Sequence, residues 1–346
     1  MKIKKSFKLN NGKEIIEYGK PYFIAELNSS HCGNIEYAQE MITEAKNSGA
    51  DCVKFQSWSS SSLYCNSYYK DNPIAERFVK KFSLSSDDLV GLCNFCKKIG
   101  IDFASTPYSE SEVDYLLDRC DVPFIKIASM EINNHNFLNY IASKETAIIL
   151  STGMSTYDEI AKAVEVIKKA GNKNLSVLHC VSVYPLSTSL ANLNNITELR
   201  DILIDLPIGY SDHTAGPEAA IASTALGCPI IEKHFTLDNS KIGMDNQMAT
   251  MPNQFKDMVD SCNLIKSIMG SFNRELSEEE LQQRTMMRRS VVSKVFITKD
   301  KIITSEDLSF KRPGNGIPPT DASKLIGKRA LHNIEADELL KQSDFV

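Results

Sequence analysis

The sequence has neither a long hydrophobic run nor an excess of positive charge. Among its 346 residues, no apolar segment approaches the length of a membrane span. Residues 1–11 are charged and no apolar segment follows them, so we expect no secretory signal peptide. The formal net charge of −5 argues against a nucleic-acid-binding protein, which would normally carry a basic face. These absences predict a cytoplasmic protein that binds neither a membrane nor a nucleic acid.

A zinc site built from cysteines is not expected either. The nine cysteines are an odd number and are scattered through segments typical of core strands and helices. Cys93 and Cys96 form one Cys-x-x-Cys pair, and no second pair is present to complete a zinc site. We interpret the cysteines as reduced, buried thiols of a cytosolic protein.

Strand and helix patterns alternate regularly through the first three quarters of the chain. Helical patterns end at Gly49, Gly100 and Gly171, where glycine commonly terminates a helix. Eight mostly apolar strands separated by helices predict an α/β fold, a closed (β/α)₈ TIM barrel. The expected strands are residues 22–27, 52–57, 101–105, 123–128, 146–151, 175–181, 206–211 and 229–235.

The composition divides the chain into four parts. These are an N-terminal β-hairpin at residues 1–20, the barrel at 21–270, a charged linker at 271–289 and a small, mostly β domain at 290–346. Within the barrel, residues 58–84 are expected to form a long loop with a short helix. A domain as small as the last one is marginal alone, so we expect it to dock on another surface.

Two histidines stand at the ends of neighbouring expected strands. Residues 208–235 read as strand, helix and strand, and the two strands finish at His213 and His234. Strands joined in this way lie parallel, so both imidazoles would project at the end where barrels keep their active sites. They would then lie within reach of one metal ion. The alternative is two histidines that are satisfied separately.

Other polar residues gather at the same strand ends. A lysine within an apolar strand is costly unless it is paired or faces a ligand. Lys54 and Lys126 are two such lysines, and hydroxyl groups lie near both in the sequence. They predict a pocket for a multiply charged anion, such as a phosphate with a carboxylate, with internal ion pairing as the alternative. The polar residues at the strand ends are Glu26, Lys54, Gln56, Ser105, Thr106, Lys126, Ser129, Glu131, Ser151, Thr152, Ser182, Tyr184, Ser211, Asp212, His213, Glu232, Lys233 and His234.

The predicted metal site has few protein ligands. His213 and His234 supply two, and Glu26 or Asp245 is able to approach. Such a site leaves positions open to water and substrate. This arrangement favours Mg²⁺ or Mn²⁺ polarising a carbonyl group over a structural zinc ion.

Motifs along nearly the whole chain resemble the sialic acid synthase family, bacterial enzymes that make nonulosonic acids. The C-terminal part resembles the antifreeze-like (SAF) domain that follows the barrel in that family. The motifs are Ile24-Ala25-Glu26, Gly49 to Gln56, Ser105-Thr106-Pro107, Lys126-Ile127-Ala128-Ser129, Ser151-Thr152-Gly153-Met154, Tyr210 to Thr214, Glu232 to Asp238 and Lys311 to Gly316.

The resemblance implies a transferase that condenses phosphoenolpyruvate with the open-chain aldehyde of an N-acyl hexosamine and releases phosphate by C–O cleavage. It implies His213 and His234 as ligands of Mn²⁺ or Mg²⁺, and Glu26 as the carboxylate at the reacting centre. Phosphoenolpyruvate contacts are implied for Lys54, Thr106, Lys126, Ser129, Ser151 and Ser211, and for Ser182, where some relatives have asparagine. Sugar contacts are implied for Gln56, Glu131, Tyr184, Asp245 and Arg312.

The resemblance also implies a domain-swapped homodimer in which Arg312 contacts the N-acyl group in the partner's barrel. An alternative for Arg312 is a solvated residue on a turn. The segment 243–249 departs from the family pattern, so the acceptor is either N-acetylmannosamine or a 2,4-diacetamido-2,4,6-trideoxyhexose. Met244 and Met248 favour the less hydroxylated sugar, with plain loop packing as the alternative.

Two other functions are considered. One is a pyruvate-dependent aldolase, which in its Schiff-base form would use Lys126. The other is a non-catalytic sugar-binding relative that keeps the barrel.

Overall fold

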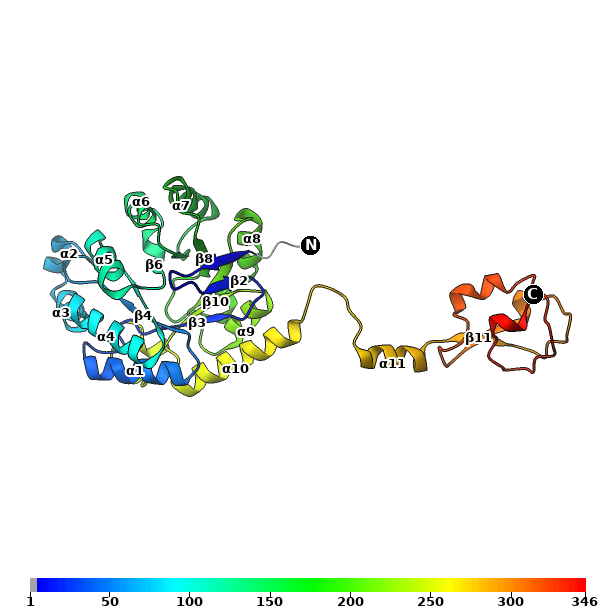
Figure 1. Cartoon of the computed structure of the whole chain (residues 1–346). Helices are drawn as coiled ribbons and strands as arrows, with labels where there is room; N and C mark the ends of the chain where they lie inside the picture. Colours follow the sequence, from blue (N-terminus) through cyan, green and yellow to red (C-terminus); the bar gives the residue numbers. More distant parts are fainter. Residues whose placement is uncertain (1–4) are drawn as a thin grey trace. The chain divides into compact units, whose positions relative to one another are not determined.

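The computed structural model describes residues 5–346, which form two compact units, one ending at Gly270 and the other spanning Ser271–Val346. The larger unit has its strands at the centre and its helices outside (Figure 1). None of the helices in the described residues is long and apolar enough to cross a membrane.

A parallel eight-stranded sheet forms the centre of the larger unit. Its hydrogen-bonded order is β5-β4-β3-β10-β9-β8-β7-β6, and the two end strands, β5 and β6, contact each other. The sheet therefore curls into a nearly closed barrel, which confirms the predicted fold class. The strands are β3 (Tyr22–Glu26), β4 (Cys52–Gln56), β5 (Asp102–Thr106), β6 (Ile125–Ile127), β7 (Ile148–Ser151), β8 (Leu175–Cys180), β9 (Ile208–Asp212) and β10 (Ile230–His234).

Local sequence signals set where the surrounding helices begin and end. Ser85 and Asp88 form a capping box at the start of α4, and Gly100 ends that helix with φ of 76°. Gly49 and Gly171, also predicted helix stops, have φ of 91° and 94°. The helices are α1 (Ile35–Asn47), α2 (Asn66–Asp71), α3 (Pro73–Phe82), α4 (Ser86–Ile99), α5 (Glu110–Tyr115), α6 (His135–Ser143), α7 (Tyr157–Lys169), α8 (Asn194–Ile202), α9 (Glu218–Ala225) and α10 (Pro252–Met269).

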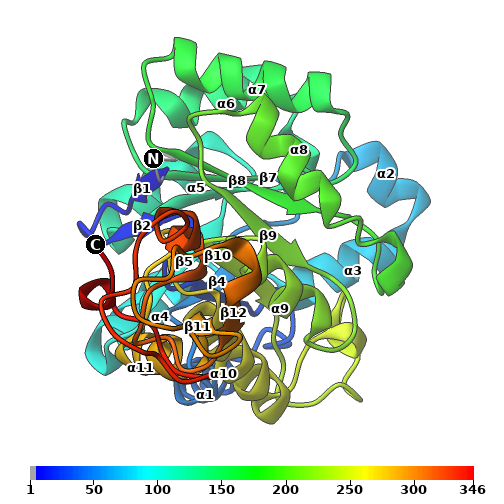
Figure 2. The ribbon, with the colours of Figure 1, turned by 90° about the vertical axis from the view of Figure 1, so that its right-hand side faces the viewer.

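The N-terminal hairpin closes one end of the barrel. Its strands β1 (Ser6–Lys8) and β2 (Glu14–Ile16) pair antiparallel, with Phe7 opposite Ile15. Phe7, Leu9 and Ile15 are buried in one cluster with side chains of the barrel interior. Figure 2 shows the hairpin on the side where the strands begin, whereas α2 and α3 lie on the side toward which they point. The opposite end of the barrel is therefore left for a binding site.

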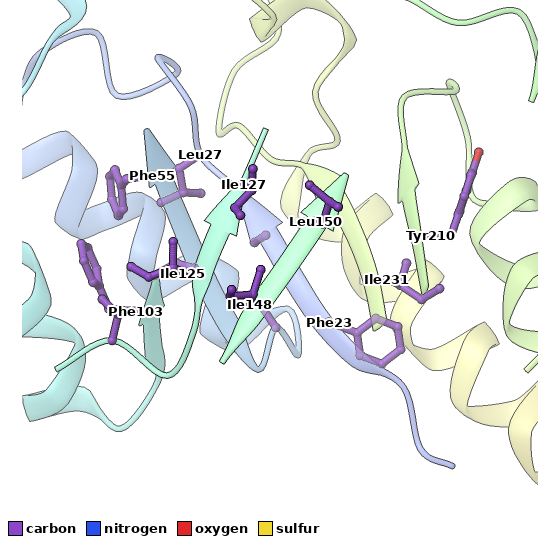
Figure 3. Packing of buried hydrophobic residues seen from close by; sticks show 14 of the residues in the cluster. Phe23, Leu27, Phe55, Phe103, Ile125, Ile127, Ile148, Leu150, Tyr210 and Ile231 are labelled. Atoms are coloured by element: carbon purple, nitrogen blue, oxygen red, sulfur yellow. The ribbon is translucent and has the colours of Figure 1, made fainter. Parts of the chain in front are cut away.

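The main core lies between the sheet and the helices. It includes Phe23, Phe55, Phe103, Ile231 and many other residues with almost no exposed surface, as Figure 3 shows for part of the cluster. Successive residues of a strand point to opposite sides, so one set packs under the helices and the other points into the barrel. This alternation leaves Glu26, Lys54 and Lys126 on the inner side of their strands, because their apolar neighbours occupy the outer one.

Residues 58–84 form two helices, α2 and α3, where the sequence predicted a long loop with a single short helix. Trp58, Tyr69, Val79 and Phe82 make a small buried cluster of their own. This packing explains the ordered segment, since four large side chains leave water together. The sequence did not predict two helices because the segment begins with a Ser-rich stretch that has no helical pattern.

The second unit has its own core. It contains α11 (Glu278–Met287), which lies in the part predicted as a linker, and the antiparallel strands β11 (Ser290–Ser293) and β12 (Leu308–Lys311). Val291, Ile303, Leu325 and Leu340 are among its fully buried residues. The unit is otherwise built of turns and short 3₁₀ segments, as expected for a small domain with few long elements.

A buried ion pair joins the ends of β9 and β10. Lys233 Nζ donates to Asp212 Oδ2 at 2.6 Å and to the Thr214 carbonyl at 2.8 Å. Asp212 is fully buried, and its other oxygen accepts from the Thr214 backbone and hydroxyl. The residues after Asp212 and Lys233 are His213 and His234, so this pair fixes the two chain segments that carry the histidines.

We expect Lys233→Met to lower the free energy of unfolding of the barrel by about 3–5 kcal/mol, because it leaves Asp212 buried without a cation. Urea denaturation measures the change. The control is Lys162→Met, which removes an exposed pair with Glu165 and should cost at most about 1 kcal/mol. Equal stability of the two variants would contradict the role assigned to the pair.

Candidate active site

A cavity of about 340 Å³ lies at the carboxyl ends of the barrel strands. Active sites of (β/α)₈ barrels lie at this end of the strands. The structure brings thirteen of the fifteen predicted site residues to its wall: Glu26, Lys54, Gln56, Thr106, Lys126, Ser129, Ser151, Ser182, Tyr184, Ser211, His213, His234 and Asp245.

Two predicted site residues are not in this wall. Glu131 follows Ser129 in a short 3₁₀ turn, and its carboxylate accepts a hydrogen bond from Asn134 at 2.8 Å. Glu131 therefore orients Asn134, whose Oδ1 accepts from the Phe137 N–H and caps the start of α6. Arg312 is exposed on the second unit, next to Pro313.

Strand register places the charged residues of the cavity side by side. Glu26 of β3 is paired with Lys54 of β4 on one side and with His234 of β10 on the other. Glu232 of β10 is paired with Ser211 of β9. Glu26, Lys54 and His234 therefore lie at one level of the barrel, and Glu232, which is paired with Ile24, lies one inward-facing position nearer the start of the strands.

The floor of the cavity is a buried network of two lysines and two glutamates. Lys54 forms a close ion pair with Glu26 and lies 3.8 Å from a Glu232 oxygen. Lys126 lies 3.8 Å from the other Glu232 oxygen. All four residues are at most 5% exposed. The internal ion pairing that the sequence left as an alternative is thus present, and both lysines also line the cavity.

Hydroxyl groups complete the contacts of the two lysines. Lys54 Nζ donates to Thr106 Oγ1 at 3.1 Å, and Lys126 Nζ donates to Ser151 Oγ at 2.6 Å. Burial lowers the pKa of Lys126, although Glu232 partly opposes this. Burial also lowers the pKa of Lys54, but the attraction of Glu232 and Glu26 outweighs it and leaves this pKa raised.

The two carboxyl groups have different protonation tendencies. Burial raises the pKa of Glu26, and the Lys54 charge only partly opposes this. For Glu232, burial is outweighed by Lys126 and Lys54, so its pKa is lowered. Ser211 Oγ also donates to Glu232 at 3.0 Å. Glu232 is therefore the permanent counter-ion of the lysines, and Glu26 is the carboxyl group better suited to exchange a proton.

The two histidines face each other at one side of the cavity. Their ring centroids are 5.4 Å apart, and the Tyr184 ring lies 4.3 Å from His213 and 5.8 Å from His234. His213 Nδ1 donates to the Val181 carbonyl at 2.8 Å, because a carbonyl only accepts, and in the neutral ring this leaves Nε2 as the acceptor. Burial lowers the pKa of His213, but its contacts with Cys180 and the Val181 carbonyl outweigh this and leave the pKa raised. Burial holds the pKa of His234 well below its ordinary value, so this imidazole is neutral at pH 7.

This donor set fits a divalent ion. Neutral imidazole is the form of histidine that ligates metals, and both rings border the same cavity. Among the described residues no group of three or more histidine, cysteine, aspartate or glutamate side chains is arranged as a metal site. The protein's share would therefore be two imidazoles, which leaves the remaining positions to water and substrate.

Close packing at Gly153 shapes the wall between β7 and β8. The Gly153 amide donates to Ser129 Oγ at 2.9 Å. A Cβ atom on this residue would lie 2.1 Å from Ser182 Oγ and 3.0 Å from Ser129 Oγ. The absence of a side chain therefore lets the two serines and a backbone amide approach one another, as in sites that bind phosphate or carboxylate groups.

Sequence reasoning missed several polar residues of the wall, among them Asn28, Trp58 and Tyr108. Asn28 donates its backbone N–H to Glu26 at 2.9 Å and its side-chain amide to Asp245. Trp58 Nε1 and Tyr108 OH both donate to Gln56 Oε1, at 2.8 and 3.1 Å. Asn28 stands two residues after Glu26, so the alternation of side chains along a strand could have indicated that it points to the same side. Trp58 and Tyr108 lie in loops, where periodicity gives no direction.

The two methionines of segment 243–249 lie in different places. Met244 lines the cavity described above, but Met248 lines a second cavity of about 490 Å³ beside α10. That second cavity contains none of the predicted site residues. The location of Met248 therefore agrees with the alternative of plain loop packing, because the short 3₁₀ turn Asn246–Met248 directs it away from the cavity with the predicted site residues.

Comparison with known proteins gives one consistent result. The NeuB family model matches residues 41–274, and the SAF domain model matches residues 288–346. The N,N'-diacetyllegionaminic acid synthase of Legionella pneumophila is 35% identical, over 92% of this chain and 93% of that protein. The human N-acetylneuraminate-9-phosphate synthase is 31% identical, over 93% of this chain and 91% of that protein.

The solved structures agree. The crystal structure of the N-acetylneuraminic acid (sialic acid) synthetase from Leptospira borgpetersenii in complex with citrate superposes with a TM-score of 0.74 at 31% identity, covering 81% of this chain and 95% of that one. The relatives named here are nonulosonic acid synthases. The chain therefore belongs to the NeuB family and carries an SAF domain at its C-terminal end.

Proposed function

We propose that the protein condenses phosphoenolpyruvate with the open-chain aldehyde of an N-acyl hexosamine to give a nine-carbon 2-keto-3-deoxy acid. The observation that carries the proposal is the cavity floor, where two buried lysines stand beside two facing imidazoles. The first pair suits a triply charged substrate, and the second suits a metal that polarises an aldehyde. The names of the relatives support this class of reaction.

Phosphoenolpyruvate would bind over the floor. Lys54 and Lys126 supply its positive partners, because both lysines line the cavity above their contacts with Glu26 and Glu232. The serine and threonine hydroxyls at the strand ends supply donors for its phosphate and carboxylate oxygens. The contacts assigned to it are Lys54, Thr106, Lys126, Ser129, Ser151, Ser182 and Ser211.

His213 and His234 would hold a Mn²⁺ or Mg²⁺ ion on the sugar side of the cavity. When bound, this ion polarises the aldehyde oxygen of the acceptor. The Val181 carbonyl fixes the ring of His213 with Nε2 available. Gln56, Tyr184 and Asp245 border the space left for the sugar, and Glu131 lies just outside the wall.

The reaction then forms one carbon–carbon bond and consumes one water molecule. C3 of phosphoenolpyruvate attacks the aldehyde carbon, and water adds at C2. The resulting intermediate loses phosphate by cleavage of the C2–O bond. Glu26 is the residue we assign to proton exchange at this centre, because burial raises its pKa and Lys54 moderates the rise.

Arg312 is assigned to the partner's active site. The resemblance described above implies a homodimer in which the SAF domain of one chain covers the barrel of the other. Arg312 is exposed, and therefore available for an intermolecular contact. A guanidinium is well suited to hydrogen-bond the carbonyl of an N-acyl group.

We expect the purified protein to release phosphate from phosphoenolpyruvate only when an N-acyl hexosamine and Mn²⁺ are both present, and to stop when EDTA removes the metal. A coupled phosphate assay measures this. Pyruvate in place of phosphoenolpyruvate should give no product, and borohydride with pyruvate should label no lysine. Labelling of Lys126 would instead indicate the Schiff-base aldolase, and tight binding without turnover the non-catalytic relative.

Gly153→Ala should raise KM for phosphoenolpyruvate by about tenfold or more, because the added methyl group displaces Ser129 and Ser182. KM for the sugar should change little. Steady-state kinetics with each substrate varied in turn gives both constants. Gly91→Ala is the matched control, since nothing lies within 4 Å of its added Cβ. An unchanged KM for phosphoenolpyruvate would place that substrate elsewhere.

Two inactive variants should restore activity in one dimer if Arg312 acts in the partner's site. Arg312→Ala and Lys126→Met are co-expressed with different tags and purified through both. The mixed dimer then has one intact site and should show about half of the normal activity per dimer. If Arg312 served its own chain, every site would carry one lesion and activity would stay low. Arg329→Ala, also exposed, is the control for the arginine substitution.

A further inference from the structure

The barrel has a seam between β5 and β6. In the part of the chain that the structure describes, no hydrogen-bonded ladder joins these two strands, although they contact each other. Helix α4 leads into β5, and the π-helical turn Leu116–Cys120 leads toward β6. Helix α4 and this turn pack against each other. A covalent link between them would therefore close the barrel at the place where its sheet is not hydrogen-bonded.

Two cysteines meet at this contact. Cys93 lies on α4, and Cys120 is the last residue of the π-helical turn, 27 positions later in the sequence. Cys93 Sγ donates to the Cys120 carbonyl oxygen at 3.1 Å, and the two thiols also hydrogen-bond to each other. A disulfide requires two cysteines that face each other at close range. Both cysteines are free in this structure, so the pair is present in its reduced form.

A small cavity gives the two thiols a route to solvent. It has a volume of about 200 Å³, lies at the amino ends of β5 and β6, and is lined by both cysteines. Its wall also includes Asn11, Lys97 and Asp121, which are exposed, so the cavity opens to the surface. A water molecule occupies about 30 Å³ of liquid, so an oxidant as small as hydrogen peroxide fits this space.

The two thiols differ in reactivity. The hydrogen bond with Cys120 lowers the pKa of Cys93, and the charge of Lys97 adds to this effect against that of burial. The same hydrogen bond, together with burial, raises the pKa of Cys120. The thiolate is the form that peroxides oxidise, so Cys93 reacts first and Cys120 follows as the resolving thiol.

Cys96, the other half of the Cys-x-x-Cys motif, is a poorer partner for Cys93. Both residues lie within α4, three positions apart. Residues at this spacing on a helix have Cβ atoms about 5–6 Å apart, whereas a disulfide needs about 3.5–4.5 Å. Burial also raises the pKa of Cys96. The partner of Cys93 is therefore on the neighbouring element and not on its own helix.

We propose that Cys93 and Cys120 are a disulfide-forming site that takes a peroxide as its oxidant and closes the barrel seam with a covalent bond. The peroxide oxidises the Cys93 thiol to a sulfenic acid and is reduced to water. The Cys120 thiol then attacks the sulfenic sulfur, the S–S bond forms, and the hydroxyl group leaves with the Cys120 proton as a second water. Two thiols and one hydrogen peroxide thus give one disulfide and two water molecules. A dithiol reductant reverses the link.

The test treats the full-length protein with hydrogen peroxide, blocks the remaining thiols with iodoacetamide and maps the unreduced peptides by mass spectrometry. We expect a peptide pair that joins Cys93 to Cys120 and disappears with dithiothreitol. Cys93→Ser should abolish this link, and Cys96→Ser should keep it. Cys65→Ser, at an exposed cysteine, is the matched control and should also keep it. No such peptide pair under conditions that oxidise Cys65, or a link between Cys93 and Cys96, would overturn the proposal.

Thermal unfolding followed by circular dichroism tests the closing of the seam. The oxidised wild-type protein should melt at least about 5 °C above the reduced protein, because the link restricts the unfolded chain. Dithiothreitol should remove this shift, Cys120→Ser should not show it, and Cys65→Ser should show all of it. The wild-type comparison needs no buried substitution, so it decides the matter even where a serine variant fails to fold. Equal melting temperatures with the link formed would overturn the role assigned to it.

Discussion

The buried network of Lys54, Lys126, Glu26 and Glu232 is the constraint on which the site depends. Each charge alone would be very costly at this depth, so the four groups are tolerable only together and with their hydroxyl partners. Strand register brings them together, because the four residues stand near the ends of adjacent or nearby strands. The network also keeps two cations in a closed barrel before any substrate arrives.

The rest of the barrel supports this arrangement from two directions. The hairpin fills the opposite end with Phe7, Leu9 and Ile15, which confines the cavity to the carboxyl ends of the strands. Behind the histidines, the ion pair between Asp212 and Lys233 ties β9 to β10. The protein thus has one set of buried charges in the cavity floor and another, on the outer side of β9 and β10, that holds the segments carrying His213 and His234 in place.

Much of the fold was predictable because parallel strands have a strong sequence signal. All eight strands lie within three residues of the positions expected from apolar runs and glycine stops. In a barrel the carboxyl ends of all strands lie at the same end, so polar residues at those ends come together. The sequence alone therefore predicted that Lys54 and His234 lie in one cavity. The pairing of Glu232 with both lysines was not predictable, since side-chain partners across a barrel interior depend on its curvature.

Loops gave the least information. Trp58 packs in a cluster with Tyr69, Val79 and Phe82, and the sequence does not show that these residues of different segments contact one another. Met244 and Met248 are close in sequence, yet a 3₁₀ turn separates them into different cavities. The charged residues of the cavity therefore stand on strands, where position follows from pattern, whereas exposed residues around it such as Met244 stand on loops, where position follows from packing.

The central claim is that the cavity floor holds phosphoenolpyruvate for a condensation in which the C2–O bond breaks. Phosphoenolpyruvate labelled with ¹⁸O at the bridging oxygen tests it most directly. After one turnover with an acceptor sugar and Mn²⁺, mass spectrometry of the released phosphate should find the label in the phosphate. Unlabelled phosphate would show that the P–O bond breaks instead, and would contradict the account.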